Sequence, residues 1–295
     1  LLQQQEKRVE AEALVNRYQF LIDRYQTFLG FAYFSDNTPP RLDATFPEYS
    51  LLITASRLQS LACSLSNAPE KNIDREIQQL RHWLAQDHSL ISKMIANAML
   101  AEKLQLTALL VQQGKMPTLR LAPLTTAEKS FQAPLQKEFA MMAHFFIDEQ
   151  YRDGNEAASW IEEIQFRAGL KKHISVNRML PLYQHYAQLA EQPVDAIKAD
   201  QFHPDPASMS EAIRNPIGNV LLETASPDFK QYLLRLVHLD ARMAVLKQLE
   251  KTETDNPVNN PWTPGKEDTL TRRDKQLCFR HAPDHDRYNS CLPLL

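Results

Sequence analysis

Two cysteines and two histidines lie within fourteen residues near the end of the sequence, in the segment LCFRHAPDHDRYNSC: Cys278, His281, His285 and Cys291. Thiolates and imidazoles are preferred ligands of zinc, and four of them complete a tetrahedral structural site. One interpretation of this segment is therefore a zinc site. However, the order Cys-x2-His-x3-His-x5-Cys matches no common zinc module, and Pro283 lies between the histidines.

A second interpretation needs only Cys278 and Cys291. A disulfide between them would close a loop of about fourteen residues and stabilise the fold by roughly 3 kcal/mol, because it restricts the unfolded chain. Such a bond implies an oxidising compartment. We favour this disulfide over free thiols or a metal site, and we expect no cofactor. The third cysteine, Cys63, lies between leucines on a predicted helix and is expected to be a buried hydrophobe.

His144 and Asp148 form the other candidate for chemistry. They are four residues apart in MMAHFFIDEQ and share one face of a predicted helix. Such a pair can transfer a proton, although a structural hydrogen bond is the simpler interpretation. The sequence contains no phosphate-binding glycine loop, nucleophile elbow or zinc-protease motif. We therefore expect no catalytic residues, and an enzyme with a site between helices near His144 and Asp148 is the alternative.

The composition is that of an ordinary soluble globular chain. Hydrophobic residues make up 43% of the 295 residues and charged residues 23%. The net charge of −3 gives no electrostatic reason to expect nucleic acid as a partner. The sequence has no run of eighteen apolar residues, so we expect no membrane span within it.

Apolar residues recur at helical spacing along most of the chain, which predicts an all-α fold with several irregularly arranged helices. The first stripe contains Leu14, Tyr18, Leu21, Tyr25 and Phe28, and residues 139–151 are expected to be deeply buried. A capping box is predicted where Glu128 follows Thr125 by three residues. Helices are expected near residues 1–29, 49–67, 70–86, 89–113, 125–151, 155–170, 174–192 and 228–250, and Pro134 is expected to break or kink the fifth of them early on.

Proline and polar residues dominate after residue 250. We therefore predict a helical domain over residues 1–250 and an irregular tail, residues 251–295, that packs back on it. Residues 269–271 (TLT) and 276–279 (QLCF) alternate weakly around RRDK, which favours a short hairpin in the tail.

The stretch NPIGNVLLETASPDFKQYLLRLVHLDARMAVLKQL resembles the C-terminal part of a group of proteobacterial envelope proteins. Those proteins have one N-terminal membrane anchor and a helical periplasmic domain. SLISKMIANAMLAEKLQLTALLV is similar to their central helix, and NPWTPGKED and CLPLL stand where the group has a P-[YW]-T-G-like turn and an LPL-like end. Pro264 is an inserted residue that the pattern of that turn does not contain. The resemblance carries no activity and no catalytic residues.

The resemblance and the cysteine pair lead to one functional expectation. The chain is expected to be a non-catalytic periplasmic scaffold or partner-binding domain, tethered to the inner membrane by a segment that this sequence lacks. Its partner is expected to be another envelope protein, and the first helix could pair with a second copy to form a homodimer. A zinc-stabilised cytoplasmic adaptor is the remaining alternative.

Overall fold

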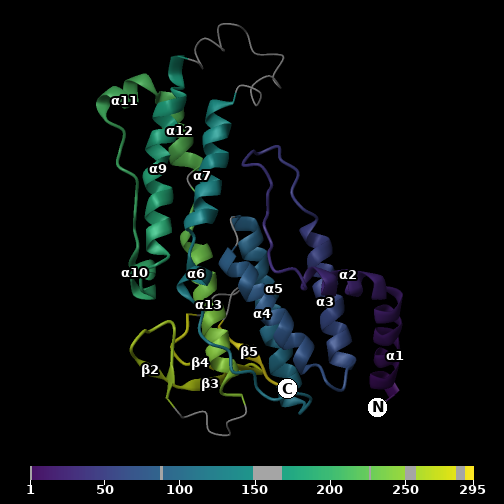
Figure 1. Ribbon diagram of the computed structural model, residues 1–295. Coiled ribbons are helices and arrows are strands. Elements are labelled where there is room, and N and C mark those ends of the chain that lie inside the picture. Colours follow the sequence, from purple (N-terminus) through teal and green to yellow (C-terminus); the bar gives the residue numbers. More distant parts are fainter. Residues whose placement is uncertain (1, 87–88, 149–167, 226, 250–256, 284–289) are drawn as a thin grey trace.

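The computed structural model describes residues 2–86, 89–148, 168–225, 227–249, 257–283 and 290–295, and most of them are helical (Figure 1). This confirms the predicted all-α class. The helices are α1 (Leu2–Arg17), α2 (Gln19–Phe28), α3 (Tyr49–Leu65), α4 (Glu70–Gln86), α5 (Leu90–Gln112), α6 (Thr126–Lys129), α7 (Gln132–Ile147), α9 (Lys172–Leu189), α10 (Val194–Ala199), α11 (Met209–Arg214), α12 (Pro216–Ala225) and α13 (Lys230–Leu246).

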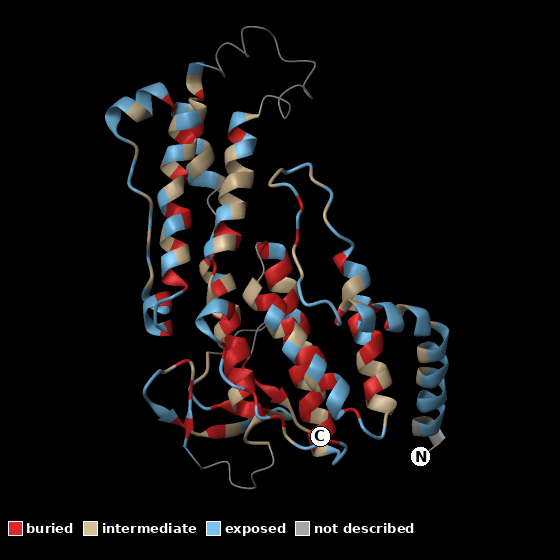
Figure 2. Cartoon of the chain, viewed as in Figure 1, coloured by how far each residue is buried: buried red, intermediate tan, exposed pale blue. Residues whose placement is uncertain are grey.

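Helix α5 forms the centre of the molecule, since it contacts α3, α4, α7, α13 and the last strand. Figure 2 shows buried residues concentrated where α4, α5 and α13 meet. The predicted inward stripe of α4 is fully enclosed: its four members are 0% exposed, namely Ile73, Ile77, Leu80 and Leu84. Burial of these branched side chains on one face stabilises α4 against α5.

By length and composition, α5 is apolar enough to cross a membrane, with a mean hydropathy of 1.3 over the qualifying window. Half of that window is buried inside the protein. The core helix of a soluble protein passes the same test, so this property is weak evidence for a membrane span. Its central packing accounts for its apolar character.

The predicted first helix is interrupted at Tyr18, where the backbone leaves helical geometry (φ −108°, ψ 20°) and separates α1 from α2. Beyond the break, α2 buries Ile22 and Tyr25 against the core. Leu14, which the stripe placed inward, is 42% exposed. The prediction of one continuous buried stripe was therefore wrong over α1.

Helices α7 and α9 pack along each other, and α12 lies beside α9 (Figure 1). The prediction of deep burial for residues 139–151 was wrong in its described part: Phe146 is buried, but Phe145 and Ile147 are 37% and 43% exposed. The Thr125–Glu128 capping box is present at α6. The helix expected at 155–170 lies almost entirely outside the described residues.

Gly218 allows α12 to approach α9 closely. A Cβ atom there would lie 2.1 Å from the Ser175 hydroxyl oxygen, which no side chain could accommodate. Beside it, the fully buried Asn215 accepts a hydrogen bond from the Lys171 backbone (2.6 Å) and donates one to Ser175 Oγ (3.0 Å). The Asn-Pro-Ile-Gly turn thus attaches α12 to α9.

The tail contains β1 (Val258–Asn259), β2 (Glu267–Asp268), β3 (Leu270–Arg273), β4 (Gln276–Phe279) and β5 (Leu292–Pro293). Strands β3 and β4 form an antiparallel hairpin, with Asp274 and Lys275 both at positive φ in the turn, as a two-residue hairpin turn requires. Strand β4 contacts α13 and β5 contacts α5. The domain division near residue 250 falls outside the described residues and stays a prediction.

Candidate functional site

The structure joins Cys278 of β4 to Cys291, just before β5, in a disulfide with 4.4 Å between the Cα atoms. Both sulfur atoms are therefore used in this bond and not as thiolate ligands. Among the described residues, no group of three or more His, Cys, Asp or Glu side chains is placed to hold a metal. His285 lies outside the described residues, so the four-ligand interpretation has no geometric support.

His281 pairs with a carboxylate of the tail. Its Nδ1 lies 2.9 Å from Asp268 Oδ1, and its backbone nitrogen donates to Asp268 Oδ2 at 3.1 Å. Burial alone would raise the pKa of Asp268, but hydrogen bonds from His281, Thr269 and Asn260 outweigh burial and lower it. The Asp268 carboxylate thus remains ionised, and it ties β2 to the end of the hairpin.

His144 and Asp148 do not form a catalytic arrangement among the described residues. His144 is exposed near the end of α7, and the contact found between the two residues is a backbone hydrogen bond from Asp148 N to His144 O (2.7 Å). Neither of the two cavities described below is lined by His144. The geometry gives the alternative enzyme site no support.

A second histidine–carboxylate pair was missed from the sequence. His185 Nε2 on α9 lies 2.7 Å from Asp200 Oδ1, and the imidazole stacks on Phe202 with 4.0 Å between ring centroids. The pair fastens the segment after α10 onto α9. Because fifteen residues separate its members, periodicity within one helix could not reveal it.

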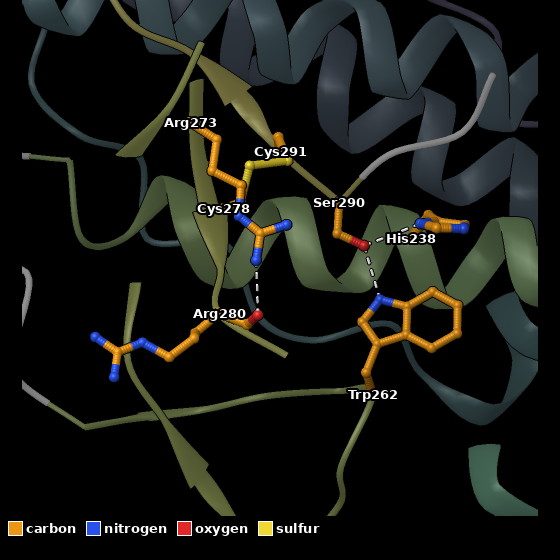
Figure 3. The surroundings of a disulfide bond; sticks show 7 residues. All are labelled: His238, Trp262, Arg273, Cys278, Arg280, Ser290 and Cys291. Carbon is orange, nitrogen blue, oxygen red and sulfur yellow. Dashed lines mark hydrogen bonds between the residues drawn. A yellow bond between two sulfur atoms is a disulfide. The ribbon is translucent and has the colours of Figure 1, made fainter. Parts of the chain in front are cut away.

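A buried serine beside the disulfide links the tail to α13 (Figure 3). Ser290 Oγ accepts a hydrogen bond from Trp262 Nε1 at 2.7 Å and lies 2.9 Å from His238 Nδ1. A serine in contact with a histidine is also the core of many hydrolase sites. Here, however, Ser290 and Trp262 are each 1% exposed and His238 is 5% exposed, so no substrate reaches the hydroxyl. We interpret the three residues as a structural link.

We expect Ser290→Ala to lower the free energy of unfolding by about 1–3 kcal/mol, because the buried Trp262 Nε1–H would lose its acceptor. Chemical denaturation checks this, and Trp262 fluorescence should change because the indole environment changes. Ser210→Ala, at an exposed position on α11, is the control and should have almost no effect. Equal stability of Ser290→Ala and the wild type would contradict the link.

One face of α13 forms the wall of a cavity of about 460 Å³. The opposite walls come from α10, the turn before it and the segment from β1 to Gly265. Its interior is lined by six buried apolar residues: Val194, Ile197, Leu233, Leu236, Met243 and Val258. Each of these is at most 9% exposed, so the cavity is a narrow apolar groove and not an open surface. We call it the α13 groove.

Two lysines line the α13 groove, and they differ in their contacts. Lys129 Nζ lies 2.6 Å from Asp240 Oδ2, and Asp240 Oδ1 accepts a further hydrogen bond from Leu124 N at 2.9 Å. The ammonium group of Lys247, at the C-terminal end of α13, makes no ion pair or hydrogen bond to any residue that the structure describes. The charge of Asp240 is therefore balanced by Lys129, and within the described part of the chain the remaining charge that lines the groove is positive.

A second cavity, of about 440 Å³, lies between α7 and α9. Leu135, Phe139 and Tyr183 contribute to its apolar part, and four glutamines surround them: Gln132, Gln136, Gln184 and Gln188. All four glutamines are exposed. It is therefore a shallow polar-rimmed surface depression, less enclosed than the α13 groove.

Comparison with protein-family models, curated proteins and solved structures finds no match to this chain.

Proposed function

We propose that this chain is a non-catalytic, partner-binding domain that works in the periplasm, in an envelope protein held at the inner membrane. The exposed helix α1 carries the proposal. The Cys278–Cys291 pair supports an oxidising compartment, because such bonds persist mainly outside the cytosol. The membrane tether rests on the sequence resemblance alone.

Helix α1 contributes almost no side chains to the buried core of the protein. From Gln5 to Arg17 every side chain is exposed or half-buried, and Figure 2 shows this helix as an almost continuous exposed surface beside α3. A single helix of this length is marginally stable in water, and most helices gain their stability from packing. Contact with a partner would supply the packing that the chain itself does not.

The exposed side chains of α1 and the start of α2 include large apolar residues. Val9 is 61% exposed and Phe20 is 59% exposed. The charges between them are balanced, with three acidic and three basic residues from Glu6 to Arg17: Glu6, Glu10 and Glu12 against Lys7, Arg8 and Arg17. A helix with both signs interspersed can pair with another copy of itself without net repulsion.

We expect a photo-crosslinking amino acid at position 9 to capture a protein, whereas the same residue at position 209 captures none. Met209 is the matched control, because it is 82% exposed on α11 at the far end of the molecule. A product of twice the chain mass identifies a homodimer through α1, and another mass identifies a different envelope partner.

Light scattering at high concentration gives a second reading of the same contact. Val9→Asp should shift a dimer to monomer, while Met209→Asp should not. Crosslinking in cell envelopes that is no stronger at position 9 than at position 209 would overturn the partner-binding role of α1.

A further inference from the structure

We propose that the α13 groove binds a single-chain amphiphile with an anionic head group, the acyl chain lying along α13 and the head group meeting Lys247. This inference goes beyond the partner-binding role and does not depend on it, since the groove lies on α13 and not on α1.

The interior of the groove suits a chain without polar atoms. Its volume of about 460 Å³ lies within the range of small-molecule sites, which are mostly apolar with a few polar groups. Leu233, Leu236 and Met243 repeat along one face of α13, with Asp240, which is paired with Lys129, between the last two. These three apolar side chains are each 2% exposed, and the half-buried Val237 and Ala244 beside them present the apolar surface that an alkyl chain would cover.

The two buried polar side chains that line the groove, Asn260 and Asp240, already have partners elsewhere in the chain. Asn260 donates to Asp268 at 2.8 Å and accepts from Trp262 N at 2.9 Å. Asp240 accepts from Leu124 N and pairs with Lys129. A peptide would bring backbone N–H and C=O groups that need partners in the groove. An alkyl chain makes no such demand, so the groove favours it over a peptide.

The charge of the groove determines the head group. Lys129 and Asp240 pair with each other, and among the residues that the structure describes Lys247 is the lining charge that has no ion-pair partner. A carboxylate or phosphate there gains a charge-assisted contact. A fatty acid and a lysophospholipid share this chemistry, and the size of the head group separates them.

Isothermal titration with dodecanoate below its micelle concentration tests the proposal. We expect one molecule per chain, with affinity rising up to about fourfold for each methylene added from octanoate to dodecanoate, until the groove is full. Dodecanol should bind more weakly, and dodecyltrimethylammonium more weakly again. A lauroyl lysophosphatidylglycerol that binds more tightly than dodecanoate would identify a phospholipid source, and the reverse order would identify a free fatty acid.

Two variants test separately the contact with the head group and the part of the groove that would hold the acyl chain. Lys247→Gln should remove the preference for dodecanoate over dodecanol, while Lys71→Gln, a distant exposed lysine on α4, should leave it unchanged. Ala244→Trp, which fills the groove, should reduce binding at least tenfold. Circular dichroism checks its folding, and Ala244→Phe replaces it if the larger side chain prevents folding.

Three results would overturn the proposal. These are no binding of dodecanoate, equal binding of the anionic and cationic amphiphiles, or binding that survives a folded groove-filling variant. Loss of the α1 crosslink described above would leave all three measurements unaffected, so failure of one proposal is distinguishable from failure of the other.

Discussion

Glu76→Gln is expected to lower the free energy of unfolding by about 3–5 kcal/mol, because it leaves the charge of Lys103 buried without a counter-ion. Lys103 Nζ lies 2.8 Å from Glu76 Oε1, and both side chains are 1% exposed at the junction of α3, α4 and α5. Tyr25 and Ser56 also donate to Glu76 Oε1, at 2.7 and 3.0 Å. Burial, together with the nearby Glu76 charge, raises the pKa of Tyr25 far above its usual value, so its hydroxyl remains a donor.

Glutamine is the replacement closest in size, because it removes the charge and places one amide nitrogen at the position of Oε2. Glu76 Oε2 is buried and has no hydrogen-bond partner in the described part of the chain, so an amide nitrogen at that position loses no contact. The amide oxygen can still accept from Tyr25 and Ser56. The loss of stability therefore combines the unpaired ammonium of Lys103 with the cost of the buried amide N–H donors, and it is read from urea unfolding as a change in midpoint at constant slope.

The chain supplies a control pair that also involves α5. Arg57 of α3 pairs with Glu102 of α5 at 2.5 Å, but their side chains are 65% and 39% exposed. Exposed pairs contribute little, so Glu102→Gln should cost less than about 1 kcal/mol. Glu76→Gln combined with Lys103→Met should recover much of the lost stability, since no charge remains buried. Equal losses of stability in Glu76→Gln and Glu102→Gln would show that burial does not increase the cost of removing one partner of the ion pair.

This buried network also explains where prediction from apolar periodicity succeeded and failed. Helix α4 was predicted well because most of its buried face is apolar, as at Ile77 and Leu80, although Glu76 on the same helix is also buried. Helix α3 was located correctly, but Leu51 was assigned inward and is 52% exposed. The inward face of α3 includes Ser56 and Gln59, whose burial depends on partners on other helices.

Burial in α7 could not be predicted for a different reason. Its apolar run was interpreted as core, yet a run of apolar residues gives no information about how many neighbours cover it. Here α7 packs along α9, and much of its surface remains half-buried or exposed, as at Phe145.

Contacts between segments that are far apart in the chain could not be predicted from the sequence either. The spacing of Cys278 and Cys291 indicated a disulfide because only a short loop had to close. His238 and Ser290 are 52 residues apart, and nothing in either local pattern connects them. The walls of the α13 groove likewise come from separate segments of the chain. The periodicity of α13 gives an apolar stripe of which Leu236 and Met243 line the groove, while Tyr232, Leu239 and Leu246 of the same stripe do not.

Replacing both Cys278 and Cys291 by serine is expected to lower the free energy of unfolding by about 3 kcal/mol. The disulfide closes a loop with a sequence separation of 13, and its loss restores the conformational freedom of that loop in the unfolded chain. Both residues are changed together so that no new unpaired thiol is created. Reduction of the wild-type protein should produce a similar loss, which serves as a control for the serine substitutions themselves.

The number of reactive thiols, counted before and after reduction, tests whether the Cys278–Cys291 bond is formed in the compartment where the protein works. The chain has three cysteines, and Cys63 is a free, buried thiol on α3. Burial raises the pKa of the Cys63 thiol, so it should react only after unfolding. Denatured protein taken from an oxidising compartment should therefore show one reactive thiol before reduction and three after it. Three thiols before reduction would mean that Cys278 and Cys291 are not joined, and the argument for a periplasmic location would lose its structural support.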